Sequence, residues 1–163
     1  MKSLININAR SIPDAIQAAQ QAIADGNQVA FSGGGTDLLQ QLKDGTDPAN
    51  VIINLRNVED TRTIVSSGAD ISVGGLITLN ELAENPLIIS GLTAIAQSAA
   101  SVGTPQIRNV GTLAGNITQR PWCWYYRNGF NCFKAGGDQC FSVNGENGQH
   151  AICLLYTSPS PRD

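Results

Sequence analysis

The sequence predicts an α+β protein built from two lobes. Over residues 1–55, short apolar runs alternate with one-sided helical patterns in the order strand, helix, strand, loop, helix, strand. That order is typical of a small, mostly parallel α/β lobe. From residue 56 the pattern changes to a hairpin, short helices, a polar glycine loop and a cysteine-containing segment. We therefore expect a first lobe over residues 1–55 and a second, larger lobe over residues 56–152.

Short runs and capping residues place the elements of the first lobe. We expect strands over residues 4–8, 29–31 and 51–55, and helices over residues 11–24 and 37–43. The first helix has an apolar face, Ser11 at its N-cap and Gly26 just beyond its end. The second helix is expected to begin with Asp37 as its cap and to end near Gly45.

The second lobe begins with a predicted hairpin. Residues 63–65 and 71–73 are expected to be strands joined by a turn over residues 68–70. Thr78 and Glu81 have the spacing of a capping box, which predicts a short helix that stops before Pro86. A second, alanine-rich helix is expected over residues 92–102, followed by a polar loop over residues 108–116. Residues 119–150 show no sustained helical or strand period.

Composition excludes several classes of function. The net charge of -3 provides no basic surface for nucleic acid, so we expect no nucleic-acid partner. No stretch approaches the roughly 20 apolar residues of a membrane span, and the first residues lack the apolar core of a signal peptide.

The first glycine loop has the composition of an anion-binding turn. Ser32, Gly33, Gly34, Gly35, Thr36 and Asp37 link a predicted strand to a predicted helix. Glycines allow successive backbone N–H groups to face one concavity, and a helix N-terminus adds positive potential, which suits a diphosphate. A tight turn without a ligand would explain the same glycines, and the loop is neither GxGxxG nor a Walker loop.

A second loop combines glycines with polar side chains. It contains Arg108, Asn109, Gly111, Thr112, Gly115 and Asn116. Together the two loops resemble those of the flavin-binding subunit of the molybdenum hydroxylase family, which includes xanthine dehydrogenase and carbon monoxide dehydrogenase. Residues 53–55, 71–75 and 78–82 also match, so the resemblance covers about residues 5–150.

The resemblance implies a two-lobed PCMH-type FAD-binding domain with a small βαβαβ lobe and a larger mixed-sheet lobe. Both loops are then expected to hold FAD, with the backbone amides of each converging on one pyrophosphate. Gln119 and Arg120 are weaker candidates by adjacency. Many members have glycine where this chain has Ala114, so φ at Ala114 must be negative.

The cysteines are clustered. Residues 1–122 contain none, and Cys123, Cys132 and Cys140 then follow within a short segment. A local cluster in an otherwise cysteine-free region favours metal binding over a disulfide scaffold. Gaps of eight and seven residues disfavour a zinc site, which usually has paired cysteines, although zinc and free structural thiols both remain alternatives.

The cysteine segment resembles the insertion in the aldehyde oxidoreductase branch of the same family, which carries a [4Fe–4S] cluster. The resemblance implies Cys123, Cys132 and Cys140 as cluster ligands, with a fourth downstream. His150 is an alternative fourth ligand. The nearby aromatic side chains are expected either to shield the cluster from water or simply to pack.

Residues 153–163 resemble one translated frame of a transposon end used to build DNA libraries. We therefore treat this stretch as a non-native tail, do not count Cys153 as a ligand, and expect a C-terminally truncated chain with poor stability and weak FAD affinity alone.

The resemblance implies an FAD-dependent electron-transfer subunit of a molybdenum-dependent oxidoreductase. Its partners would be a molybdenum-cofactor subunit and a [2Fe–2S] subunit, in the cytoplasm or, by co-export with a partner, in the periplasm. No pairing of nucleophile with base indicates a proton-transfer residue. Two alternatives are a non-catalytic nucleotide- or metal-binding scaffold and an oxidase with covalently linked flavin.

Overall fold

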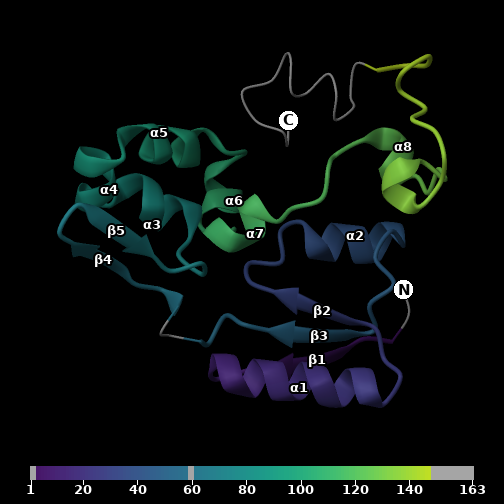
Figure 1. Ribbon diagram of the computed structural model, residues 1–163, viewed down its shortest axis with the longest axis horizontal. Helices are drawn as coiled ribbons and strands as arrows, with labels where there is room; N and C mark the ends of the chain where they lie inside the picture. The colour runs from purple at the N-terminus through teal and green to yellow at the C-terminus, as the bar shows by residue number, and fades with distance from the viewer. Residues whose placement is uncertain (1–2, 59–60, 148–163) are drawn as a thin grey trace.

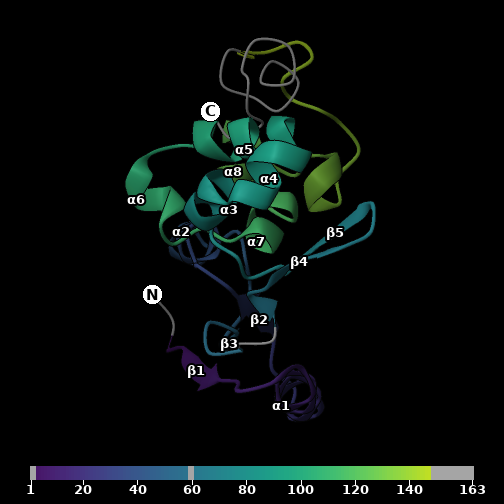
Figure 2. The same cartoon turned by 90° about the vertical axis from the view of Figure 1, so that its left-hand side faces the viewer.

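The computed structural model describes residues 3–58 and 61–147, and its first lobe is a three-layer α/β unit (Figure 1). Three parallel strands form its sheet in the order β1 (Ile5–Asn8), β3 (Val51–Asn54), β2 (Val29–Ser32). Helix α1 (Ile12–Ala24) lies on one face of the sheet and helix α2 (Leu38–Asp44) on the other (Figures 1 and 2). The predicted parallel lobe is confirmed.

Local capping explains where α1 begins. The Ser11 hydroxyl accepts a hydrogen bond from the Asp14 backbone N–H at 3.2 Å, as the sequence predicts. The helix then buries Ala15, Ala19 and Ala22 in the first core, which also contains Ile53 of β3. Small side chains at these positions allow the helix to lie close to the sheet.

Asp37 does not cap α2, so this prediction is wrong. Asp37 occupies the N-cap position but makes no side-chain capping bond there. Its carboxylate instead accepts hydrogen bonds from Gln41 and from Arg127 in the cysteine segment. The predicted end of the helix is confirmed, because Gly45 adopts a left-handed conformation with φ of 73°.

The second lobe is dominated by helices. A hairpin of β4 (Ile64–Ser67) and β5 (Asp70–Val73) precedes α3 (Leu79–Glu84), α4 (Pro86–Gly91) and α5 (Thr93–Ser101). Among the described residues its sheet is this antiparallel pair plus an isolated bridge between Thr78 and Thr112, which is smaller than the mixed sheet expected.

Two capping features organise these helices. The predicted capping box of Thr78 and Glu81 is present at the start of α3. Helix α3 ends before Pro86 as predicted, but α4 starts at that proline and was not predicted. The Asn85 side chain accepts bonds from Leu87 and Ile88, and proline at the first helical position needs no N–H partner.

The stretch predicted as a polar loop over residues 108–116 is mostly helical. Helix α6 (Pro105–Arg108) ends in it and α7 (Leu113–Ile117) begins in it, which leaves residues 109–112 as the connection. Thr104 and Thr112 each cap the helix that follows. Ala114 therefore has helical rather than positive φ, which meets the condition expected for it.

The cysteine segment contains α8 (Trp124–Arg127) and the short 3-10 helix η2 (Phe133–Ala135). The rings of Tyr125, Phe130 and Phe141 pack against one another at centroid distances of 5.1 to 5.7 Å. No helix within the described residues has both the length and the apolar character that crossing a bilayer requires.

The apolar side chains form two separate cores. The first surrounds Ile53, and the second surrounds Leu82 and Ile88 in α3 and α4. Val58 and Leu76 complete the first core from beyond residue 55, so the division between residues 55 and 56 stays a prediction.

Candidate functional site

The two predicted loops lie in direct contact. A side chain at Gly34 would collide with the Val110 carbonyl oxygen. A Cβ atom at Gly33 would lie 2.7 Å from the Thr112 hydroxyl oxygen. One at Gly111 would lie 3.5 Å from the Thr36 hydroxyl oxygen. At Gly34 the two loops meet backbone to backbone. The glycines therefore permit a close approach between stretches far apart in the sequence.

The first loop has uncommitted backbone donors. Within the described residues, the N–H groups of Gly33, Gly34, Gly35, Thr36 and Asp37 donate to no other backbone group. Adjacent glycine-loop amides of this kind can bind an anion. Their role in holding a diphosphate stays a prediction.

The second loop has already used most of its backbone donors. The N–H groups of Val110 and Gly111 both donate to the Ile107 carbonyl, and that of Asn109 donates to Pro105. Beyond Thr112, the next amides donate to the carbonyls of residues 77 and 75 or to Thr112 itself. The expectation that amides of both loops converge on one pyrophosphate is therefore corrected, because these amides hold α6, α7 and the β5–α3 connection in place.

A cleft of about 280 Å³ opens beside the first loop. Most of the predicted residues line it: Ser32, Gly33, Gly34, Gly35, Thr36, Asp37, Thr112 and Gly115, with Gln119 and Arg120 at one side. A second hollow of about 320 Å³ shares Gly33 and Thr112 and adds Asn109. The contact between the loops thus has a hollow on each side.

Arg108, Gly111 and Asn116 line neither hollow. The Arg108 guanidinium donates to the carbonyls of Val102 and Gly103, both at 3.1 Å, and thereby ties α6 to the end of α5. This contact gives the Arg108 guanidinium a structural role, and the cofactor contact of Arg108 stays a prediction.

Several buried polar atoms at this junction have no hydrogen-bond partner in the described part of the chain. They are the Gln41 and Gln119 Oε1 atoms, the Asn116 Nδ2 atom and one Arg127 nitrogen. A buried polar group without a partner costs about 1–3 kcal/mol, which a bound polar ligand can offset. Uncommitted amides, a mixed set of donors and acceptors, and a cleft between them suit a dinucleotide.

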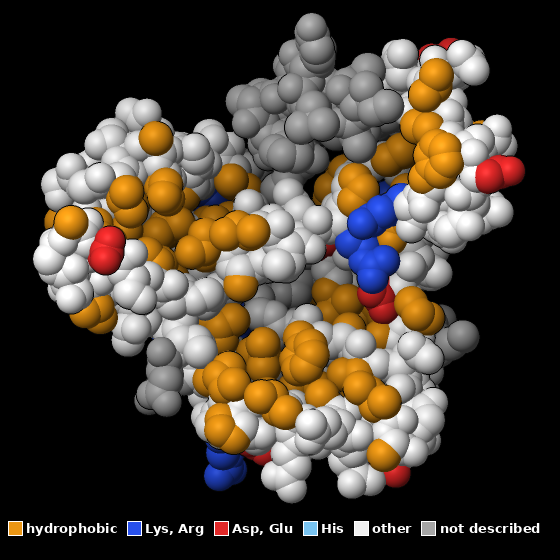
Figure 3. Space-filling view, in the orientation of Figure 1, with side chains coloured by type: hydrophobic (Ala, Val, Ile, Leu, Met, Phe, Trp, Pro, Cys, Tyr) orange, Lys and Arg blue, Asp and Glu red, His pale blue; other side chains and the backbone are white. Residues whose placement is uncertain are grey.

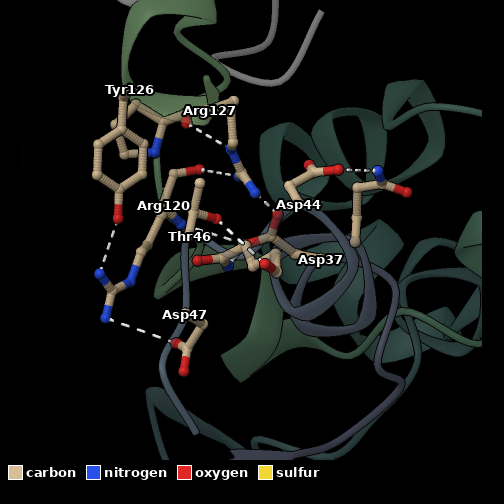
Figure 4. A network of polar contacts seen from close by, with 10 residues as sticks. Asp37, Asp44, Thr46, Asp47, Arg120, Tyr126 and Arg127 are labelled. Atoms are coloured by element: carbon tan, nitrogen blue, oxygen red, sulfur yellow. Dashed lines mark hydrogen bonds and ion pairs between the residues drawn. The ribbon is translucent and has the colours of Figure 1, made fainter. Parts of the chain in front are cut away.

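Asp37 and Arg127 form a buried ion pair across this cleft's edge (Figure 4). The Arg127 nitrogen lies 2.7 Å from the Asp37 carboxylate, and their side chains are only 6% and 12% exposed. The sequence analysis did not single out Arg127 or Gln41. The i to i+4 spacing of Asp37 and Gln41 was a usable signal, but nothing local marks Arg127.

Arg120 extends this network to the surface. Its guanidinium donates to the Tyr126 hydroxyl at 2.8 Å and lies 3.8 Å from the Asp47 carboxylate. The hydrogen bond to Tyr126, aided by nearby acidic groups, raises the pKa of Arg120. Figure 3 shows basic side chains gathered on this face between α8 and the first lobe, with acidic side chains beside them.

The three predicted metal ligands line one small hollow. Cys123, Cys132 and Cys140 surround a space of about 150 Å³ together with mostly apolar and aromatic side chains. The Ser142 hydroxyl, 3.1 Å from the Cys140 sulfur, lowers the pKa of that thiol. Within residues 3–58 and 61–147, however, no three His, Cys, Asp or Glu side chains are close enough to hold a single metal ion. His150 and Cys153 lie outside the described residues.

Comparison with known proteins decides the family. The model for the FAD binding domain in molybdopterin dehydrogenase matches residues 7–144. The chain belongs to this family. The match takes in both glycine loops and the cysteine segment. The family named in the sequence analysis is thereby confirmed, whereas its aldehyde oxidoreductase branch is not established.

Individual relatives agree with this assignment. The chain is 34% identical over 110 residues to a putative xanthine dehydrogenase FAD-binding subunit of Escherichia coli, covering 67% of this chain and 36% of that protein. It is 26% identical over 137 residues to an aldehyde oxidoreductase FAD-binding subunit of Escherichia coli, covering 80% and 43%. The chain thus spans less than half the length of these curated relatives.

A solved structure supports the fold. The carbon monoxide dehydrogenase of Hydrogenophaga pseudoflava aligns with a TM-score of 0.67 at 24% identity, covering 71% of this chain and 39% of that chain. The α+β fold class predicted from the sequence is confirmed by this likeness.

Proposed function

We propose that this chain is the FAD-binding part of an electron-transfer flavin subunit in a molybdenum-dependent oxidoreductase. One observation carries the proposal: the backbone N–H groups of five consecutive loop residues, Gly33 to Asp37, donate to no backbone group within residues 3–58 and 61–147. They lie beside a cleft in a chain whose family binds FAD. The amides would hold the diphosphate. The Gln41 and Gln119 Oε1 atoms, which have no partner among the described residues, would accept hydrogen bonds from other polar parts of the dinucleotide, because both residues line the cleft. Asn109, Thr112 and Gly115 border the same junction.

FAD supplies the redox chemistry, because a flavin handles both one-electron and two-electron steps. The residues of this chain bind it, orient it and set the charge around it. Partners of the whole protein would be a molybdenum-cofactor subunit and a [2Fe–2S] subunit; two relatives are themselves named as FAD-binding subunits, one of a xanthine dehydrogenase and one of an aldehyde oxidoreductase. Either the cytoplasm or, by co-export, the periplasm suits such a complex.

We further propose that Cys123, Cys132 and Cys140 hold a [4Fe–4S] cluster together with a fourth ligand. Their convergence on one hollow supports this, as do its aromatic and apolar walls. Ligands of such a cluster bind different irons, so they stand further apart than ligands of a single ion, and the lack of a one-ion site among the described residues is compatible with a cluster. Surrounding apolar groups would limit water access and tune its potential.

Cofactor content of the full-length subunit, purified with its partners, tests the flavin assignment. We expect FAD in a ratio close to one per subunit, measured by visible absorbance after gentle purification. Colourless protein without flavin would favour the alternative of a nucleotide- or metal-binding scaffold whose glycines only make turns.

Iron and sulfide analysis tests the cluster. The Cys123→Ser and Cys132→Ser variants should lose most of their iron, while Asn128→Ala, an exposed change in the same segment, should keep it. Unchanged iron in both cysteine variants would end the cluster hypothesis. Zinc in place of iron and sulfide would support the zinc alternative.

A further inference from the structure

Asp37 lies in an unusual position for an acidic residue. It is the last residue of the loop whose free amides suit an anion, and its side chain is only 12% exposed. A carboxylate beside a diphosphate repels it, and the repulsion is strong where water is excluded. The first lobe provides Asp37 with one partner, the Gln41 side-chain amide at 2.7 Å, which carries no charge.

The charge of Asp37 is compensated from a remote segment. One carboxylate oxygen accepts a bond from the Arg127 guanidinium at 2.7 Å, and the other accepts from the Arg120 backbone N–H at 3.3 Å. Both donors belong to the stretch that carries the cysteines. The neutrality of the cleft's edge therefore depends on how that stretch is folded.

Arg127 is held in turn by its own segment. Its guanidinium donates to the carbonyl oxygens of Pro121 and Arg120 at 3.1 and 3.0 Å and lies 4.9 Å from the centre of the Trp122 ring. The residue is at the end of α8, whose N-cap is Cys123. Tyr126, its neighbour in α8, lines the hollow that contains the three cysteines. One short helix thus joins the cysteine hollow to the ion pair.

We propose that the Asp37–Arg127 pair couples the cysteine hollow to the FAD cleft: ordering of the cysteine segment places Arg127, which neutralises Asp37 and so raises affinity for the dinucleotide. This inference rests on the proposed function. Arg127 acts here as a positioning and charge-compensating residue and need not touch the cofactor. By linkage, FAD bound in the cleft stabilises the folded cysteine segment to the same extent.

The decisive measurement is FAD affinity of the full-length subunit in its complex, after flavin removal, by titration with FAD. Arg127→Gln should weaken binding about tenfold or more, because it removes the charged group hydrogen-bonded to the Asp37 carboxylate at 2.7 Å and leaves only the more distant Arg120 guanidinium to offset that charge. Adding Asp37→Asn to that variant should restore most of the affinity, since the repulsive charge is then gone. Arg10→Gln removes the same charge from an exposed site outside the cleft and should bind FAD as the unchanged protein does.

A further variant tests whether the cysteine segment is coupled to FAD binding. Cys132→Ser should weaken FAD binding in the presence of Asp37 and have a much smaller effect in the Asp37→Asn background. A general loss of folding would weaken FAD binding in both backgrounds, and circular dichroism and thermal melts of each flavin-free variant identify it.

Two results overturn the coupling. One is unchanged FAD affinity in Arg127→Gln; the other is a double variant that binds as weakly as Arg127→Gln alone. If the unchanged protein itself takes up no FAD, the proposed function fails instead, so the two failures are distinguishable.

Discussion

Gly34 occupies the point where the two loops press together, and its lack of a side chain permits their contact. The neighbouring loop presents the Val110 carbonyl at the position a Cβ atom would take. Backbone cannot move aside as the end of a flexible side chain can. At the residue scale, the site therefore depends on the lack of a side chain at Gly34 as well as on the residues that line the cleft.

Gly34→Ala should separate the loops and lower both stability and flavin content. We expect a loss of about 3 kcal/mol in the free energy of unfolding, at the upper end for overpacking, and a marked fall in bound FAD. Urea unfolding and the ratio of flavin to protein absorbance measure the two effects.

Gly45→Ala is the matched comparison. Gly45 has φ of 73° but open space around it, so alanine there costs about 1–2 kcal/mol of backbone strain without a collision. Equal losses of unfolding free energy and of bound FAD in the two variants would show that backbone strain, rather than the contact between the loops, explains the effect of Gly34→Ala.

At the scale of elements, the start of α3 is stabilised by a reciprocal pair. The Glu81 carboxylate accepts bonds from the Thr78 backbone N–H and hydroxyl, both at 2.8 Å, and the Thr78 hydroxyl accepts from the Glu81 N–H. The backbone bond from Thr78, with a further contribution from Arg62, lowers the pKa of Glu81 below its usual value. Helix α3 in turn carries the strand-like bridge to Thr112 at its N-cap.

The lowered pKa predicts an acid-sensitive contribution to stability. Glu81 binds its proton more weakly in the folded state, so its contribution is present above the ordinary value of 4.5 and is lost as the pH falls through the folded pKa. Glu81→Gln should therefore be less stable than the unchanged protein near neutral pH and approach its stability as the pH falls from 4.5 through the lowered pKa of Glu81. Urea unfolding at several pH values tests this; a difference that does not depend on pH would contradict it.

At the scale of the whole molecule, two cores share no residue. Ile53 belongs to the first and Ile88 to the second, and each is fully buried. Among the described residues, the loop contact, the Asp37–Arg127 pair and the Arg120–Asp47 pair connect the lobes at the candidate site. Val58 and Leu76, from beyond residue 55, add apolar packing in the first core. A ligand in the cleft therefore lies where the two cores are joined by polar contacts.

Separate cores predict additive mutational effects. In the flavin-free protein, Ile53→Val and Ile88→Val should each cost about 0.5–1.5 kcal/mol, and the double variant should lose the sum within about 0.5 kcal/mol. Denaturant unfolding of the unchanged protein, both single variants and the double variant measures how far the losses depart from additivity. A departure from additivity of more than about 0.5 kcal/mol would mean that the two cores are packed as one unit.

Local signals were sufficient for much of the fold. The caps at Ser11 and Thr78 and the left-handed end at Gly45 each involve residues within a few positions of one another, and all three are confirmed. The sequence predicts neither helix α4 nor the helical part of residues 108–116, because Pro86 indicates a helix stop and the polar, glycine-containing composition of residues 108–116 indicates a loop. Their cap residues were visible, but the helices are too short to show a period.

Resemblance of the two glycine loops to known sequences indicated the family, which the comparison confirmed. The sequence alone determined the parallel first lobe and the position of the first glycine loop, since glycine content and capping residues act over short distances. Only the tertiary structure decided which donors remain available. It committed the amides after Asn109 to carbonyls of residues 75, 77 and 107, and it paired Asp37 with Arg127. Residues 75 and 77 are distant along the chain from the amides they accept from, as Asp37 is from Arg127, and packing of the whole molecule, rather than local preference, brings these partners together.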